Sequence, residues 1–225
     1  MKSTRTAVDK DIQSLTSWIN DRPDHNSVAS FQPGPGIQKL ALCFDINQLQ
    51  LALEQCLASI EFQGSMQEQG FAAIPVTQRP GQTSWTENDL SGRYWIRGDD
   101  RYIEEPREDL VAEDQFSELI PAFAGTYFEH VYDELTRRFP VGRTRILSKP
   151  RYNCNSWHRD PEPRIHIPII SNPGSVFVVN HHATHLPADG SVYFTDTRGY
   201  HTALNGGDVN RVHLVAALAC EQITE

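Results

Sequence analysis

The chain has 225 residues, of which 39% are hydrophobic and 22% are charged, the composition of an ordinary globular protein. It holds 20 Lys and Arg against 29 Asp and Glu, so its formal net charge is −9. Proteins that bind nucleic acid or anionic membranes usually carry a basic stripe, and this sequence has none. The charge therefore excludes a nucleic-acid or membrane partner and favours a small-molecule or peptide substrate.

No apolar run reaches the length of a signal peptide near the N-terminus, or of a transmembrane helix anywhere. The four cysteines are scattered without a C-x-x-C pair, which argues against a disulfide framework and against a cysteine zinc site. These features predict a reduced, cytoplasmic protein.

The N-terminal segment is predicted to stand apart from the rest of the chain. Residues 9–20 carry apolar side chains at helical spacing, and a stretch rich in proline and glycine follows. We therefore expect an N-terminal helix and loop at 1–36, followed by a single catalytic domain at 37–225.

Two helices are predicted within that domain, after a strand at 37–44. The first, at 45–60, has Asp45 as its N-cap and Gln48 three residues later, as in a capping box. The second, at 121–139, has Pro121 in its first turn and an aromatic stripe that suits packing against a sheet. Both helices are expected to pack outside a β-barrel.

Short strands dominate from residue 143 onward, separated by turns that contain Pro, Gly or Asn. They are RTRILS, RIHIPII, SVFVVN, GSVYFTD and NRVHLVAAL. Many short, closely spaced strands are typical of a β-sandwich or barrel. The predicted fold class is mainly β with supporting helices (α+β), built around a barrel at the C-terminal end.

The strand RIHIPI alternates with a period of two residues. Ile165, Ile167 and Ile169 share one face, and Arg164 and His166 share the other. If the isoleucines face a core, the arginine and the imidazole point toward something else. This face is therefore a candidate ligand site, although Arg164 could instead be an ion-pair partner of nearby acids.

His158 and Asp160 are one residue apart, so in extended backbone their side chains project to the same side. A histidine and a carboxylate at this spacing, with a distant second histidine, form the 2-His-1-carboxylate pattern of non-haem Fe(II) oxygenases. Several histidines could complete the set, and His201 is favoured by its surroundings. It follows a strand and precedes Arg211 by ten residues, a separation that predicts neighbouring antiparallel strands with both side chains in the barrel.

Together these residues resemble the aspartyl/asparaginyl β-hydroxylase family, which includes bacterial members that hydroxylate free amino acids such as proline. The resemblance covers roughly residues 143–218 and rests on the motifs HRD (158–160), RIH (164–166), H-x-x-x-N (201–205) and RVH (211–213). It implies an Fe(II)- and 2-oxoglutarate-dependent oxygenase on a double-stranded β-helix, the jelly-roll or cupin-like barrel.

The resemblance also implies roles for individual residues. His158, Asp160 and His201 match the metal ligands, and Arg211 matches the arginine that binds the far carboxylate of 2-oxoglutarate. Arg164 and His166 match the strand that lines the same pocket. No catalytic residue beyond the metal ligands is implied, and dioxygen would take the open metal position.

The expected reaction is therefore hydroxylation of an unactivated C–H bond of an amino acid, either free or as an Asp or Asn residue in a peptide. Two alternatives stay open. One is a cupin-like metal dioxygenase or isomerase that does not use 2-oxoglutarate, and the other is a non-catalytic metal-binding barrel. The sequence does not reveal the role of a histidine cluster formed by His181, His182 and His185.

Overall fold

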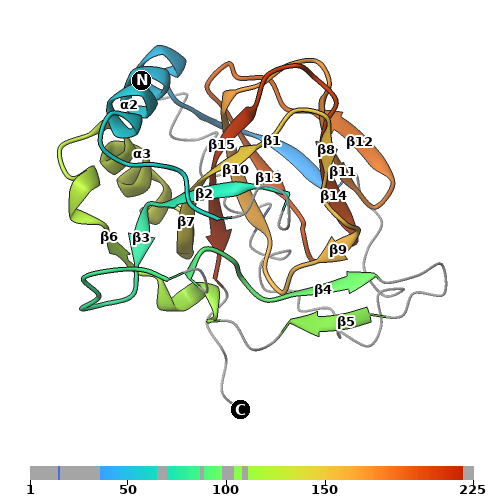
Figure 1. The fold of residues 1–225 in the computed structure, drawn as a ribbon, viewed down its shortest axis with the longest axis horizontal. Coiled ribbons are helices and arrows are strands. Elements are labelled where there is room, and N and C mark those ends of the chain that lie inside the picture. The colour runs from blue at the N-terminus through green and yellow to red at the C-terminus, as the bar shows by residue number, and fades with distance from the viewer. Residues whose placement is uncertain are drawn as a thin grey trace.

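The computed structural model describes residue 15 and residues 36–64, 70–86, 89–97, 104–107 and 111–219, and two antiparallel sheets dominate it (Figure 1). The first sheet has the strand order β1 (Ile37–Cys43), β13 (Ser191–Thr195), β10 (Arg164–Ile170), β15 (Arg211–Leu218), β7 (Val141–Lys149), β2 (Ala72–Pro75). The second sheet has the order β12 (His182–His185), β11 (Ser175–Val179), β14 (His201–Asn205), β9 (His158–Arg159), β4 (Tyr94–Arg97), β5 (Glu104–Arg107).

Three short strands complete the β structure: β8 (Asn153–Cys154), which pairs with β14, and the separate pair β3 (Thr77–Gln78) and β6 (Glu118–Leu119). From β7 onward the chain passes back and forth between the two large sheets. The resulting order, β7-β15-β10-β13 in one sheet and β9-β14-β11-β12 in the other, is that of a jelly-roll barrel. The predicted fold class is confirmed.

Two helices, α2 (Ile46–Leu57) and α3 (Tyr127–Thr136), lie together on one side of the first sheet (Figure 1). The main hydrophobic core joins them to that sheet, and it includes Leu49, Phe128 and Val131 from the helices and Ile165, Ile167 and Leu214 from the strands. Asp45 begins α2 as predicted, because its Oδ1 accepts hydrogen bonds from the backbone N–H groups of Asn47 (2.9 Å) and Gln48 (3.2 Å).

The prediction of one continuous helix at 121–139 is wrong. A 3₁₀ turn, η4 (Pro121–Phe123), is followed by Gly125 with φ +74°, and α3 begins only after Thr126. A residue with that φ interrupts an α-helix, and glycine adopts it without steric cost. Phe123 and Phe128 are nevertheless both buried and meet edge to face, with ring centroids 5.9 Å apart. The first helix is also shorter than the predicted 45–60.

The predicted N-terminal segment at 1–36 lies outside the described residues except for Leu15 and Gly36. Leu15 is helical and fully buried in the main core. In the described part of the chain, no helix is both long enough and apolar enough to cross a membrane.

Strand β10 shows how the sequence pattern positions the site. Ile165, Ile167 and Ile169 face the helices and are completely buried. Arg164 and His166 are buried on the opposite face, between the two sheets. The alternation predicted from the sequence therefore separates an apolar outer layer from a polar interior.

Candidate metal centre

The structure brings His158, Asp160 and His201 together. His158 on β9 is the antiparallel partner of His201 on β14, and Asp160 follows β9 directly. The potential ligand atoms of the three residues lie within 4.8 Å of one another. His201 Nε2 is 3.6 Å from Asp160 Oδ2, and the two imidazole centroids are 4.1 Å apart. This set is compact enough for one metal ion.

Backbone carbonyls fix the orientation of both imidazoles. His158 Nδ1 lies 2.7 Å from the carbonyl oxygen of Ser156, and His201 Nδ1 lies 3.0 Å from that of Gly199. A carbonyl can only accept, so in the neutral form of each imidazole Nδ1 carries the proton and Nε2 keeps its lone pair. Metal-binding histidines are commonly held in this way. The donor set thus fits a divalent transition metal.

Asp160 is buried but remains ionised. Burial by itself would raise its pKa, but the charged guanidinium of Arg164 outweighs this effect and holds the pKa below its usual range. Arg164 Nε donates to Asp160 Oδ2 at 2.7 Å, which orients the carboxylate. Burial and the neighbouring His158 lower the pKa of His201 to about 3, so its imidazole is neutral and able to bind a metal.

Arg164 forms ion pairs with two buried carboxylates. Its guanidinium pairs with Asp160 and also lies 3.5 Å from Glu113 Oε1. Glu113, in the 3₁₀ turn η3 (Glu113–Gln115), is itself buried and lies 3.2 Å from Arg143 Nε. Arg164 lines the cavity as expected, while its ion pairs favour the alternative of an ion-pair partner of nearby acids.

Glu113 is a residue that the sequence analysis did not identify. It lies outside the predicted barrel strands, and no spacing relates it to the metal ligands. Gly92 lies against this carboxylate: a Cβ there would be 1.8 Å from Glu113 Oε1, so a larger residue would require Glu113 to shift.

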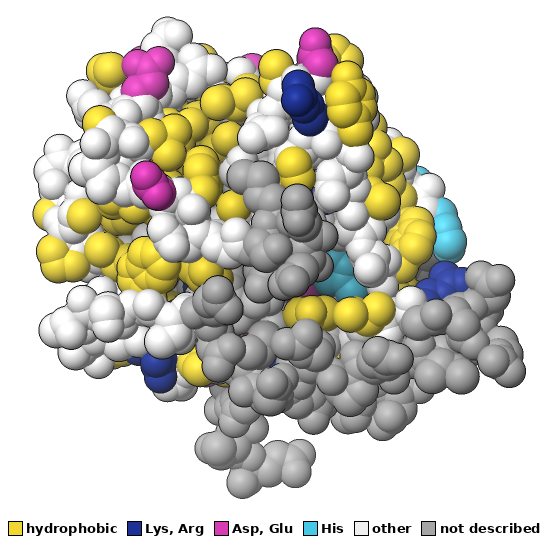
Figure 2. Space-filling model, viewed as in Figure 1, with side chains coloured by type: hydrophobic (Ala, Val, Ile, Leu, Met, Phe, Trp, Pro, Cys, Tyr) yellow, Lys and Arg dark blue, Asp and Glu magenta, His cyan; other side chains and the backbone are white. Residues whose placement is uncertain are grey.

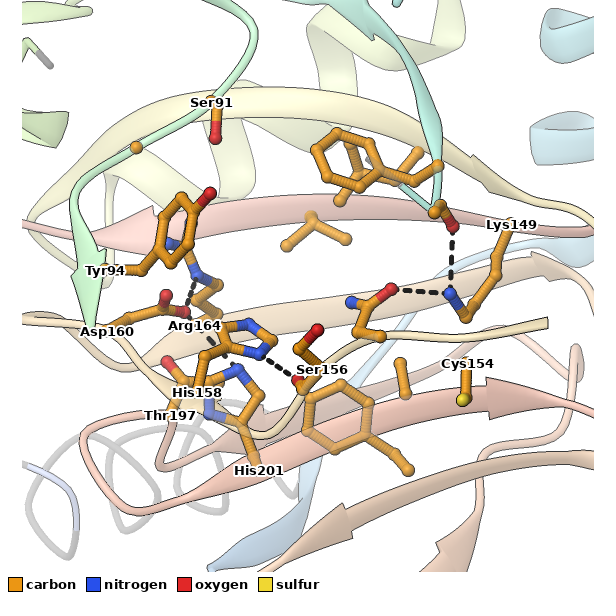
Figure 3. A pocket seen from close by; sticks show the side chains of 18 of the residues that line it. Ser91, Tyr94, Lys149, Cys154, Ser156, His158, Asp160, Arg164, Thr197 and His201 are labelled. Carbon is orange, nitrogen blue, oxygen red and sulfur yellow. Dashed lines mark hydrogen bonds and ion pairs between the residues drawn. The ribbon is translucent and has the colours of Figure 1, made fainter. Parts of the chain in front are cut away.

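A cavity of about 700 Å³ adjoins the candidate ligands. This volume falls within the usual range of small-molecule sites. Figure 3 shows His158, Asp160 and His201 near Tyr94 and Ser91, with Lys149 and Cys154 toward the other end. On the surface, a histidine side chain is visible in a recess above a row of hydrophobic side chains (Figure 2).

Arg211 lines this cavity and lacks a partner for part of its guanidinium. Its side chain is buried, and its Nε and Nη1 have no hydrogen-bond partner among the described residues. Asp196, the acidic residue that follows β13, pairs with Arg198. Burial lowers the pKa of Arg211 to about 10, so the group is charged at neutral pH. An unpaired buried cation of this kind is suited to binding a carboxylate.

The strands of His201 and Arg211 are not neighbours, contrary to the sequence prediction. β14 belongs to the second sheet and β15 to the first, so the two side chains approach the same cavity from opposite sheets. The ten-residue separation predicts neighbouring strands, but in this jelly roll the chain passes from one sheet to the other between β14 and β15.

His166 and His213 lie near Arg211 on the same inner face. Their Nδ1 atoms are 3.4 Å apart, and both Nε2 atoms are buried without a partner in the described part of the protein. Burial and the charge of Arg211 hold both pKa values well below the usual range, so the imidazoles are neutral. His166 also packs against Phe177, with ring centroids 4.9 Å apart. His166, which lines the cavity, offers a hydrogen bond to a polar ligand.

Lys149 is a second residue that the sequence analysis missed. It is the antiparallel partner of Arg211, and its side chain is buried in the cavity wall. Its Nζ donates to Gly70 O (2.9 Å), Asn153 Oδ1 (2.9 Å) and Asn155 Oδ1 (2.5 Å). Burial and the adjacent Arg211 lower its pKa to about 7. Two cationic side chains thus share one end of the cavity.

The histidine cluster does not contribute to the cavity wall. His182 and His185 lie on β12 and His181 lies in the turn before it, where φ is +67°. None of the three lines the cavity described here.

Comparison with known proteins gives only distant similarities. No family model matches the chain, and no curated protein matches it. Similar solved structures include a 2OG-Fe(II) oxygenase family oxidoreductase from Burkholderia pseudomallei, at 16% identity over 88% of this chain and 90% of that one, with a TM-score of 0.47. A Pseudomonas putida prolyl-4-hydroxylase matches at 11% identity over 85% of this chain and 94% of that one, with a TM-score of 0.43.

Proteins of other activities match as well. The DMSP lyase DddQ from Ruegeria pomeroyi DSS-3 has 11% identity over 100% of this chain and 95% of that one, with a TM-score of 0.38. At these identities and TM-scores the similarities assign no activity, so the case for a function depends on the residues of the site.

Proposed function

We propose that this protein is an Fe(II)- and 2-oxoglutarate-dependent dioxygenase that hydroxylates an unactivated C–H bond of an amino acid, free or within a peptide. The observation that carries the proposal is one cavity that holds both a His-Asp-His set and a buried, partly unpaired arginine. Three protein ligands leave metal positions open for a chelating cosubstrate and dioxygen. Arg211 suits the far carboxylate of that cosubstrate.

His158, Asp160 and His201 would hold the iron through two Nε2 atoms and a carboxylate oxygen. Bound iron and 2-oxoglutarate supply the oxidation: dioxygen gives one oxygen atom to succinate, formed with carbon dioxide, and the other to the substrate C–H bond. The protein positions and shields these groups. Arg164 orients Asp160, and Arg211 with His166 binds the cosubstrate.

The direct test is an anaerobic titration of the metal-free protein with Fe(II) and then 2-oxoglutarate. The proposal predicts a visible metal-to-ligand charge-transfer band, and its loss in His158→Ala. If Fe(II) binds without producing this band, the protein is a metal enzyme of another kind, such as a cupin-like dioxygenase or isomerase. If no metal binds, the proposed centre is wrong.

Replacing Arg211 with glutamine is expected to weaken 2-oxoglutarate binding about tenfold to a hundredfold, because hydrogen bonds to charged groups contribute roughly 1.5–3 kcal/mol. Fe(II) affinity should be unchanged, since Arg211 is not a ligand. The charge-transfer band measures both constants. The matched control is Arg137→Gln, which removes an arginine charge from an exposed side chain. Equal 2-oxoglutarate affinity in the Arg211 and Arg137 variants would contradict the role of Arg211.

Lys149 should make cosubstrate binding depend on pH. With a pKa of about 7, it is partly neutral in the free protein. A bound dianion raises that pKa, so binding takes up a proton and affinity should fall as pH rises above 7, by up to about tenfold per pH unit. His166 and His213 are already neutral in this range. Lys149→Arg, which stays charged, should bind 2-oxoglutarate with a flatter pH profile. Identical profiles for the two proteins would exclude Lys149 as the cause.

A further inference from the structure

The geometry points to a second anion-binding subsite in the same cavity: we infer that the substrate carries a carboxylate and that Arg145 binds it. This inference rests on the proposed function and deepens it by assigning the substrate class.

Arg145 lines the cavity from β7 with its guanidinium incompletely paired. Its side chain is 4% exposed, and one Nη donates to the backbone carbonyl of Leu90. Its Nε is buried and has no hydrogen-bond partner among the described residues. Burial lowers its pKa to about 9, so it is still charged at neutral pH. The bond to Leu90 therefore holds the guanidinium in place, while the rest of the group can still donate hydrogen bonds.

The charges around the cavity leave Arg145 without a carboxylate. Asp160 pairs with Arg164, Glu113 with Arg143 and Arg164, and Glu162 with Arg93. For Arg145, Lys149 and Arg211, no ion pair exists within the described part of the chain. The protein thus buries three cationic side chains that form no ion pair with any carboxylate of the described residues. Bound anions would compensate for these charges.

One bound 2-oxoglutarate dianion does not compensate for all three of these positive charges. Lys149 and Arg211 face each other across β7 and β15, whereas Arg145 faces Val215, four residues along both strands. Four residues of extended strand span about 13 Å. Arg145 therefore lies at a separate position along the cavity, and a cosubstrate whose far carboxylate binds Arg211 leaves it unpaired.

Two other arginines near the cavity already have partners within the protein. Arg143 stacks on Phe116, with its Cζ 3.9 Å from the ring centroid, and donates to the backbone carbonyls of Asp89, Ser91 and Val111. Arg93 is the partner of Glu162. Arg145 is consequently the arginine best placed to meet a ligand at this end.

The surroundings of Arg145 suit a small amino-acid substrate. Ser91, Gly92, Tyr94 and Ile96 also line the cavity, and Tyr94 meets His158 edge to face, with centroids 5.9 Å apart. Figure 3 shows Ser91 and Tyr94 on the same side of the cavity as the candidate metal ligands. A substrate held by its carboxylate at Arg145 would therefore place its carbon chain between Tyr94 and the metal.

The test uses the full chain loaded anaerobically with Fe(II) and saturating 2-oxoglutarate, with the charge-transfer band as proof of loading. Isothermal titration calorimetry then measures binding of the twenty L-amino acids and of their primary amides. At least one amino acid should bind, and at least about tenfold more tightly than its amide, because the amide lacks the charge. Arg145→Gln should abolish this preference while the band remains. Arg145→Lys keeps the positive charge but not the planar guanidinium, so it should retain part of the preference for the acid over the amide.

The outcomes separate the two proposals. Absence of the band in the parent protein refutes the proposed function itself. If the band forms, the inference is overturned when no amino acid binds, when acid and amide bind equally, or when Arg145→Gln keeps the preference. If Arg145→Gln does not fold, Arg145→Lys provides the test, through its affinity for the amino acid divided by its affinity for the amide. A ratio equal to that of the parent protein contradicts bidentate binding by Arg145. Arg137→Gln serves as the surface control throughout.

Discussion

The Asp160→Ala variant is expected to lose its iron, its succinate production and a large part of its folding stability. Asp160 supplies the only carboxylate of the proposed donor set. It is also the buried partner of Arg164, at 2.7 Å. Breaking a buried ion pair by removing one partner typically costs about 3–5 kcal/mol, because the remaining charge is left uncompensated.

Comparison with His201→Ala separates these two effects. His201 is neutral, so its removal should abolish metal binding and turnover without breaking a buried ion pair. Metal content after dialysis and denaturant unfolding measure the two quantities. A stability loss as large in His201→Ala as in Asp160→Ala would contradict the role assigned to the Arg164 pair. Undiminished turnover in either variant would refute the ligand assignment.

The Glu113→Gln variant should destabilise the protein by about 3–5 kcal/mol without removing a metal ligand. Glu113 is 1% exposed and lies between Arg143 and Arg164. Burial by itself would raise its pKa, but the surrounding arginines outweigh this effect and keep the pKa below its usual range. Glutamine keeps the size of the side chain and removes the charge that these arginines need.

The matched control is Glu134→Gln on α3, where Glu134 pairs with Arg137 and Arg138 near the surface. Surface pairs contribute about 0–1 kcal/mol, so this variant should unfold almost like the parent. Denaturant unfolding with a common slope gives the difference. Equal stabilities of the two variants would show that the buried cluster contributes no more than a surface pair.

Local sequence patterns determined much of the barrel. Alternation in RIHIPII predicted both faces of β10, because side chains in a strand alternate between the two sides. The spacing of His158 and Asp160 predicted a shared direction, and the structure places both beside His201. Similarly, a capping residue determined where α2 begins. Each of these inferences depends on residues a few positions apart.

Only the tertiary structure decided which charged residues meet. Glu113 pairs with Arg164, which is 51 positions further along the chain. The break at Gly125 divides a predicted helix, and His201 and Arg211 belong to different sheets. Lys149 and Arg145 also join the cavity through the register of β7 with β15. The sequence by itself therefore determined the two faces of β10 and the candidate metal ligands. Strand pairing between distant segments decided the surrounding charges, because burial and pairing arise only when those segments pack together.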